Sequence, residues 1–461
     1  MQIVPSTFLA LIAIAALLRM GPRNGLGVFL ALTPLGAAAA FNLPAVGGAS
    51  IMLVQLAVVA VVALVCLTPG GIDRLAGTLR PGQPGFWMAL LLLYCIFSAL
   101  FAARVFQGAT EVFSLSRSAN DSGIVSIPLR PGTGNITQLF TLTIAALGFA
   151  TFATLLRMTP DARLVLRGMA LATVVHFILG WLDVLTFSAG LQILMEPIRT
   201  ANYAILVDHA MAGMKRMIGG FPEASSFGYF SLGLTAFWLH YWISAPMSRR
   251  APWMLALVGT VLLRSTSSAA YVSLVLFLAT YALVMLALSL RARVGRRGAA
   301  IAAAGAVAVW AAAMAIFLAY HMVEPVTAFL DRALFDKLDG ASGVERMSWN
   351  AQAFVNFRET WFLGAGLGSV RASNWLMAVL ASLGVIGAVL FAAFFTTLAR
   401  APLPKDDLRG PVVGALKAAA LAFLISAMLT ASTPDLGVIF FAVCGLIAGL
   451  SRGAQLESRP N

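Results

Sequence analysis

The chain has 461 residues, of which 60% are hydrophobic and 11% are charged, and its mean hydropathy is +0.90. Soluble globular proteins carry about 25% charged residues, so this composition excludes an ordinary soluble domain. The net charge of +13 would suggest nucleic acid as the partner of a soluble protein. In a membrane protein, the distribution of these charges first indicates how the chain is oriented in the bilayer. We therefore expect the lipid bilayer, and no nucleic acid, as a partner.

Apolar segments with few charges recur along the chain. The clearest are Trp253–Leu263, Leu139–Leu156, Ala269–Leu290, Ala299–Tyr320 and Leu376–Ala399. A helix needs about 20 apolar residues to cross a bilayer, and all of these but the short Trp253–Leu263 segment reach or approach that length. Whether the first apolar segment and the short pair around Arg264 each span the membrane is left open. The sequence predicts an all-α polytopic membrane protein, with residues 1–461 as a single integral membrane domain of about 12–13 transmembrane helices.

The basic residues distinguish the two sides of this membrane domain. Most of them lie in short connections, from Arg19 and Arg23 to Arg452 and Arg459. Short loops rich in Lys and Arg normally stay in the cytoplasm. The three long loops, at about 104–137, 190–225 and 321–374, then face outward, with the N-terminus outside and the C-terminus inside. The last two of these loops form the expected active-site face.

Two stretches of the outer loops repeat apolar residues at helical spacing. The first is 204–218, with Ala204, Val207, Met211, Met214 and Ile218 on one face; the second is 347–361, with Met347, Ala351, Phe354, Phe357 and Trp361. Such a stripe is typical of a short amphipathic helix lying in the membrane interface. Packing against the membrane domain is the simpler role for the stripes themselves.

Motifs for metals and nucleotides are absent from the sequence. It has no His-Glu-x-x-His motif and no Asp-x-Asp in an outer loop, so we expect no metal and no cofactor. The stretch GAGLGS, Gly364–Ser369, imitates part of a dinucleotide-binding fingerprint, but no predicted strand precedes it. We interpret it as a tight backbone turn before the next span.

Several cations of the outer side are suited to binding phosphate. Lys215, Arg216 and Arg346 lie in outer loops, and Arg264 interrupts an apolar stretch. An arginine within a span normally faces protein or a water-filled cavity. Its planar fork can bind two phosphate oxygens at once. Snorkelling or a structural ion pair is the alternative role for each of them.

Two acids are candidate proton acceptors. Glu223 follows Pro222 at the predicted start of a helix, and Asp183 lies inside a span near its outer end. Either carboxylate could deprotonate a sugar hydroxyl. Glu223 could instead stabilise the positive end of the helix dipole, and Asp183 could be a buried, hydrogen-bonded residue that serves packing alone.

Three stretches of the second half of the chain carry a family resemblance. They are RMIGGFPEASSFGYF (Arg216–Phe230), LLRSTSSAAYVSLVLFLATY (Leu262–Tyr281) and ERMSWNAQAFVNFRETWFLGAGLGSVRASNWLMAVLASLGVIGAVL (Glu345–Leu390). Together they resemble the O-antigen polymerase and O-antigen ligase family of bacterial envelope glycan enzymes. The first has Pro222 and Glu223 in swapped order relative to the family pattern.

The resemblance implies a multi-pass glycosyltransferase of the bacterial inner membrane, with its N-terminus in the periplasm and its C-terminus in the cytoplasm. It would be metal-independent and inverting, with a glycan on undecaprenyl pyrophosphate as donor. Arg216 resembles the family's donor-phosphate arginine. The second such arginine would fall at Ser268, and Arg264, one helical turn earlier, could replace it. Lys215 and Arg346 join them as pyrophosphate ligands.

The resemblance also implies sugar contacts and partners. Arg371, Asn374 and Trp349 of the long outer loop would contact the sugars, and a chain-length regulator and a flippase of the same pathway are candidate partners. Family ligases have a His before an Asn in this loop, and the chain has Ser373 before Asn374. We therefore expect a polymerase of O-antigen, capsule or exopolysaccharide repeat units.

Three alternatives remain open. The first is an O-antigen ligase that transfers glycan to lipid A core. The second is a transporter, such as a lipid-linked oligosaccharide flippase, which should have related halves and broken helices near the bilayer midplane. The third is a non-catalytic envelope scaffold, in which single arginine changes would be harmless.

Overall fold

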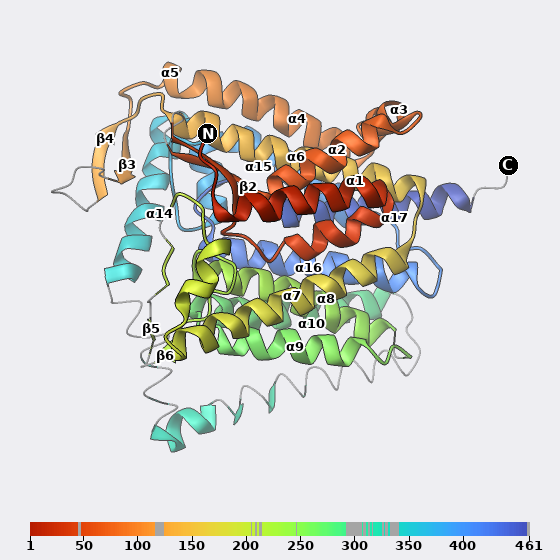
Figure 1. Ribbon diagram of the computed structural model, residues 1–461. Coiled ribbons are helices and arrows are strands. Elements are labelled where there is room, and N and C mark those ends of the chain that lie inside the picture. Colours follow the sequence, from red (N-terminus) through yellow and green to blue (C-terminus); the bar gives the residue numbers. More distant parts are fainter. Residues whose placement is uncertain are drawn as a thin grey trace.

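The computed structural model describes residues 1–44, 48–115, 124–203, 205–207, 210–211, 214–245, 247–291 and 341–458, with scattered single residues and short pieces between 307 and 331. Most helices run along one common direction, and the short strands gather at one end (Figure 1). Among the described residues, eight helices are long and apolar enough to cross a membrane, or nine if a bent pair counts as one span. The chain is an all-α polytopic membrane protein.

The N-terminal region folds back on itself within α1 (Pro5–Leu32). Gly21 has φ 72°, a left-handed conformation that favours glycine, and it separates two helical arms. A Cβ atom on Gly25 would lie 3.0 Å from the Leu17 side chain, so the second arm packs against the first. Arg19 and Arg23 flank the turn between the two arms.

The remaining elements follow in chain order. A hairpin of β1 (Ala39–Leu43) and β2 (Ala49–Met52) precedes α2 (Leu53–Leu67), which meets α3 (Gly71–Thr78) at a bend of 116°. Next come α4 (Pro84–Phe97), the π-helix η2 (Ser98–Ala102), α5 (Ala103–Val105), a hairpin of β3 (Glu111–Leu115) and β4 (Ile124–Pro128), α6 (Thr133–Met158), α7 (Ala162–Ser188) and the 3-10 helix η3 (Gln192–Ile198). The second half contains β5 (Ala210–Met211), β6 (Met214–Lys215), α8 (Ala224–Ser244), α9 (Ala251–Arg264), α10 (Ser268–Arg291), α14 (Ala341–Glu359), α15 (Trp375–Ala399), α16 (Arg409–Thr430) and α17 (Val438–Glu457).

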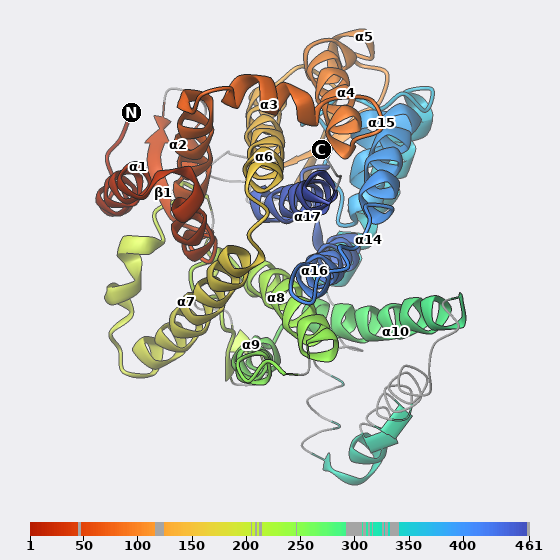
Figure 2. The same ribbon diagram turned by 90° about the vertical axis from the view of Figure 1, so that its right-hand side faces the viewer.

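Small residues allow α17 to pack closely against α6 at the centre of the bundle (Figure 2). Gly445, Gly449 and Gly453 repeat at every fourth position of α17. A Cβ atom on them would approach the backbone oxygens of Phe149, Ala153 and Leu156 to 2.4, 2.7 and 2.6 Å. Spacing of this kind lets two membrane helices bring their backbones together, where van der Waals packing holds them.

The outer-loop predictions have different outcomes. The helix predicted at 347–361 is present as α14, which ends at Glu359, but its predicted packing face is wrong: Met347, Phe354 and Trp361 are exposed, and Trp349 and Ala353 are buried together with Phe357. The helix predicted for 204–218 is wrong in its described part, because β5 pairs there with β6 as a short antiparallel hairpin. Side chains from elsewhere bind the backbone of this segment, as the next section describes, and such bonds compete with a helix.

The apolar segments predicted from the sequence also have different outcomes in the structure. The segment Ala299–Tyr320 lies largely outside the described residues. The predicted short segment before Arg264 is α9, whose 14 residues are fewer than a spanning helix needs. The Gly364–Ser369 stretch is a turn, with positive φ angles of 87°, 106° and 84° at Gly364, Gly366 and Gly368. This agrees with its interpretation from the sequence.

Candidate functional site

Asp183 holds together the segment that carries Arg216. It lies near the end of α7 and is 1% exposed. Its Oδ1 atom accepts from Arg199 Nη2 at 2.5 Å and from Lys215 Nζ, and its Oδ2 accepts from the backbone N–H groups of Ile218 and Gly219 at 2.8 and 3.1 Å. Both carboxylate oxygens are thus occupied by donors from the segment before α8. This is the packing role that the sequence left open for Asp183, with Arg199 as the partner that the sequence analysis did not single out.

Arg199 and Lys215 extend this network. Arg199 also donates to the backbone oxygen of Gly219, at 2.7 Å from Nη2 and 3.2 Å from Nε. The backbone oxygen of Lys215 accepts from Arg264 Nη1 at 3.0 Å. The Lys215 side chain is 4% exposed, and its ammonium group pairs with Asp183. Lys215 therefore contacts Arg264 through its backbone oxygen and not through its side chain.

Arg216, between these anchored residues, has unused hydrogen-bonding capacity. Its buried Nε–H finds no acceptor among the described residues. Burial lowers the pKa of the Arg216 guanidinium, the Glu223 carboxylate raises it and the charge of Arg346 lowers it. Arg346 extends from α14 and is exposed. Arg216, Arg264 and Arg346, hereafter the arginine cluster, therefore form a positively charged group with one acid beside it.

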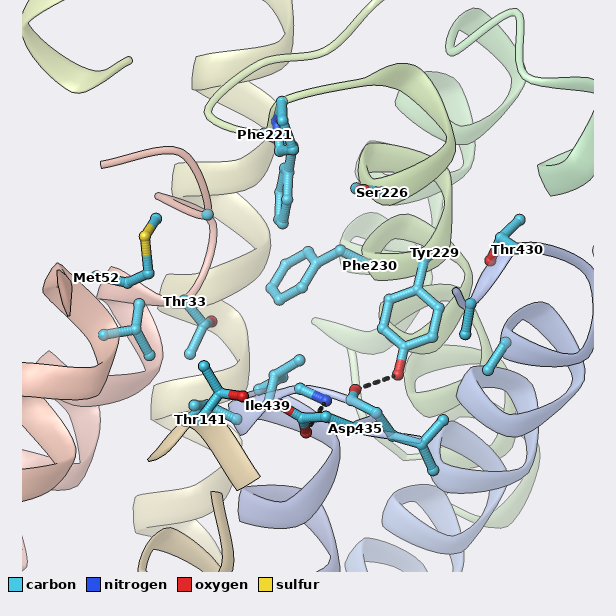
Figure 3. Close-up of a pocket in the computed structure, with 18 of the residues that line it drawn as sticks. Thr33, Met52, Thr141, Phe221, Ser226, Tyr229, Phe230, Thr430, Asp435 and Ile439 are labelled. Carbon is cyan, nitrogen blue, oxygen red and sulfur yellow. Dashed lines mark hydrogen bonds between the residues drawn. The ribbon is translucent and has the colours of Figure 1, made fainter. Parts of the chain in front are cut away.

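A cavity of about 440 Å³ with both polar and apolar walls lies beside Glu223, whose charge acts on Arg216; none of its described lining residues is an arginine. Its wall comes from residues 33–36 and 52–55, from Thr141 of α6, from residues 221–230 and from residues 427–439. Figure 3 shows Thr141, Asp435 and the Tyr229 hydroxyl at one edge, and Phe221 and Ser226 at the other. Glu223 lines the cavity, and its carboxylate accepts from the Ser225 hydroxyl.

The connection between α16 and α17 brings Asp435 to the cavity, and three hydrogen bonds hold it. The backbone oxygens of Ser432, Pro434 and Leu436 accept from Ala372 N at 3.3 Å, Trp375 Nε1 at 3.0 Å and Tyr229 Oη at 2.9 Å. The sequence analysis did not select Asp435. An acid in a short connection directly before an apolar span was the available signal.

The predicted sugar ligands lie apart from the cavity wall. Asn374 uses both ends of its amide, since Oδ1 caps α15 at Met377 N and Nδ2 donates to Met428 O at 2.6 Å. Trp349 is buried beneath Arg371, whose Cζ atom lies 5.6 Å from the indole ring. Arg371 is exposed, so among these three it is the side chain with a free face.

Within the described residues, no group of three or more His, Cys, Asp or Glu side chains could hold a metal ion. A scan against protein-family models finds no match for this chain, and a search of curated proteins finds none either. The fold places the chain in the class of multi-pass helical membrane proteins.

Proposed function

We propose that this protein is a bacterial inner-membrane glycosyltransferase that polymerises undecaprenyl-pyrophosphate-linked repeat units of an O-antigen, capsule or exopolysaccharide on the periplasmic face. The observation that carries the proposal is that Glu223 both lines the cavity and acts electrostatically on Arg216 of the arginine cluster. The cluster suits an anionic donor, and the cavity suits a hydroxyl-rich acceptor. The resemblance to the O-antigen polymerase and ligase family supports the same assignment.

Arg216, Arg264 and Arg346 would bind the donor pyrophosphate. The pyrophosphate gains negative charge as the anomeric C–O bond breaks, and preplaced guanidinium groups stabilise that charge. A charge-assisted hydrogen bond contributes about 1.5–3 kcal/mol net. The unpartnered Nε–H of Arg216 supports this role, because a phosphate oxygen would satisfy a donor that the described residues leave without an acceptor.

Asp183 and Lys215 would position the cluster and not contact the substrate. Their mutual ion pair and the bonds from Asp183 to Ile218 and Gly219 support this assignment over the catalytic and phosphate-binding roles expected from the sequence. Glu223, between Arg216 and the cavity, would orient groups where donor and acceptor meet. Arg371 would contact the glycan at the exposed surface.

The experiment uses purified protein in nanodiscs with an undecaprenyl-pyrophosphate-linked repeat unit and EDTA, and follows chain growth on a gel. We expect ladders from the wild type and their loss in Arg216→Lys and Arg264→Lys, because lysine keeps the charge and loses the planar fork. Arg358→Lys, an exposed arginine of α14, is the matched control and should elongate normally.

Other outcomes would redirect the proposal. Single transfer to lipid A core without elongation would indicate a ligase. Movement of the lipid-linked glycan across the bilayer without elongation would indicate a transporter. Ladders that need a divalent cation would contradict metal independence, and full activity of both lysine variants would contradict the site.

A further inference from the structure

Asp435 has a position that the arginine cluster does not explain. It lies in the connection from α16 to α17, opposite the part of the cavity wall that carries Phe221 and Ser226 (Figure 3). Its Oδ1 atom accepts from the backbone N–H of Gly437 at 2.9 Å, and the Thr141 hydroxyl, which donates to Gln138 O, lies close enough to lower the pKa of the Asp435 carboxyl. No cation pairs with Asp435 within 4.0 Å in the described parts of the chain.

This lack of a cation separates Asp435 from the other two acids of the region. The charge of Asp183 is balanced by Arg199 and Lys215. The Glu223 carboxylate interacts electrostatically with Arg216 and accepts a hydrogen bond from the Ser225 hydroxyl. Asp435 has only neutral donors and a cavity in front of it. A partly buried acid without a cationic partner is costly for the fold, and one that faces a cavity is a candidate functional group.

The connection that carries Asp435 is fixed on both sides. Ala372 and Trp375 hold it from the start of α15, and Tyr229 holds it from α8. Gly437, with φ 85°, turns the chain directly into α17. A carboxylate mounted on such a held backbone keeps its direction, which is what a group that must meet one hydroxyl requires.

We propose that the cavity binds the acceptor glycan and that Asp435 is the general base that takes the proton from its attacking hydroxyl. This inference rests on the proposed glycosyltransferase function and names the acceptor side of it. The hydroxyl side chains of Ser225, Thr430 and Thr433 line the same cavity and can hydrogen-bond a sugar, while Tyr229 and Phe230 offer aromatic surface.

The step balances within the two substrates. The acceptor oxygen forms a bond to the anomeric carbon of the donor as its proton passes to Asp435. The bond from that carbon to the pyrophosphate oxygen breaks, and the leaving lipid pyrophosphate keeps the electron pair, stabilised by the arginine cluster. Asp435 then returns its proton to water. Attack from the face opposite the leaving group inverts the anomeric carbon.

Burial supports the assignment, because it raises the pKa of the Asp435 carboxyl, against the smaller lowering by Gly437 N–H and by the Thr141 hydroxyl. A base works best when its pKa approaches the working pH. The other titratable groups around Asp435 are Tyr229 of α8, Glu223 across the cavity and Cys95 of α4.

The test measures elongation rate against pH in the nanodisc assay, with donor binding measured separately. We expect Asp435→Asn to lower the rate about 100-fold or more and to leave donor binding within about threefold. Asp435→Glu should retain part of the activity. Asp407→Asn, an exposed acid of the connection between α15 and α16, is the matched control and should keep the wild-type rate.

A second variant keeps the test decisive if Asp435→Asn does not fold. Thr141→Val removes a hydroxyl that lowers the Asp435 pKa, so the acid limb of the pH–rate profile should move to higher pH. Two outcomes would contradict the role of Asp435 as the base. They are an unchanged pH–rate profile in Thr141→Val, and wild-type elongation by Asp435→Asn while Arg216→Lys is inactive. Neither outcome would contradict the glycosyltransferase function. A wild type that does not elongate overturns both.

Discussion

Arg199 and Asp183 form an ion pair of 2.5 Å between the residue after η3 and the end of α7, with side chains only 5% and 1% exposed. Through the same carboxylate the backbone N–H groups of Ile218 and Gly219 are fixed, two and three residues after Arg216. The direction of Arg216 therefore depends on an acid of another element.

The first prediction concerns Asp183→Asn. The amide leaves Arg199 and Lys215 without their counter-charge, and removal of one partner from a buried ion pair costs about 3–5 kcal/mol. We expect a clear fall of the midpoint of thermal unfolding in detergent and weaker donor binding, because the 215–219 segment loses its anchor. Asp407→Asn should leave both unchanged. Unaltered stability of Asp183→Asn would contradict the structural role of the pair.

The second prediction separates binding from catalysis, with farnesyl pyrophosphate as a short-chain donor analogue in titration calorimetry. Arg216→Lys and Arg264→Lys should each weaken binding about tenfold or more, which corresponds to one lost charge-assisted bond. Arg358→Lys should not change it, and added salt should weaken binding by the wild type. If farnesol binds as well as farnesyl pyrophosphate, the cluster does not recognise phosphate.

The sequence gives the class of the protein because burial in a bilayer demands long apolar helices, and their composition is visible without a structure. It also locates Arg216 and Glu223, which lie near each other in the chain. It cannot reveal that Asp183 contacts Lys215, or that Asp435 meets Thr141, because those contacts join segments far apart in the chain. The helix predicted for 204–218 is wrong for the same reason, because hydrogen bonds with the distant residues Asp183 and Arg264 determine the backbone conformation at the end of this segment.

The third prediction is a pH dependence of stability at the opposite end of the bundle. Asp161 begins α7 and is bound by Arg23 at 2.9 Å and by the backbone N–H groups of Arg163 and Leu164. Burial raises the pKa of Asp161, but these hydrogen bonds outweigh it, and the pKa lies below its usual value. The stabilisation is therefore complete above the ordinary pKa of about 4 and is lost as the pH falls through the folded value.

Asp161→Asn should then destabilise the protein by about 1 kcal/mol or less at pH 7, since Asn still caps a helix and the Arg23 pair is solvent-exposed. The difference from the wild type should shrink as the pH falls below the folded pKa. Thermal unfolding at a series of pH values checks this. A difference that grows in acid would show that the sign of the pKa shift is wrong.

The fourth prediction compares two glycines with similar backbone angles. Gly368 and Gly108 have φ 84° and 73°, but a Cβ atom on Gly368 would meet Gly134 O at 2.3 Å and one on Gly108 would meet nothing within 4 Å. Gly108→Ala should cost about 1–3 kcal/mol from backbone strain alone. Gly368→Ala should cost more, because α6 must also move. Equal unfolding midpoints for the two variants would contradict the close approach of this turn to α6.

The wall of the cavity joins residues 33–55 with residues 427–439, which are synthesised long after them. During synthesis the earlier helices would already be inserted while this part of the wall is still being made. Asp435 and α17 complete it only after α16 has been made, as α17 packs against α6 through its glycines. A chain that has been made only as far as α16 therefore contains the arginine cluster but lacks Asp435 and the last part of the cavity wall.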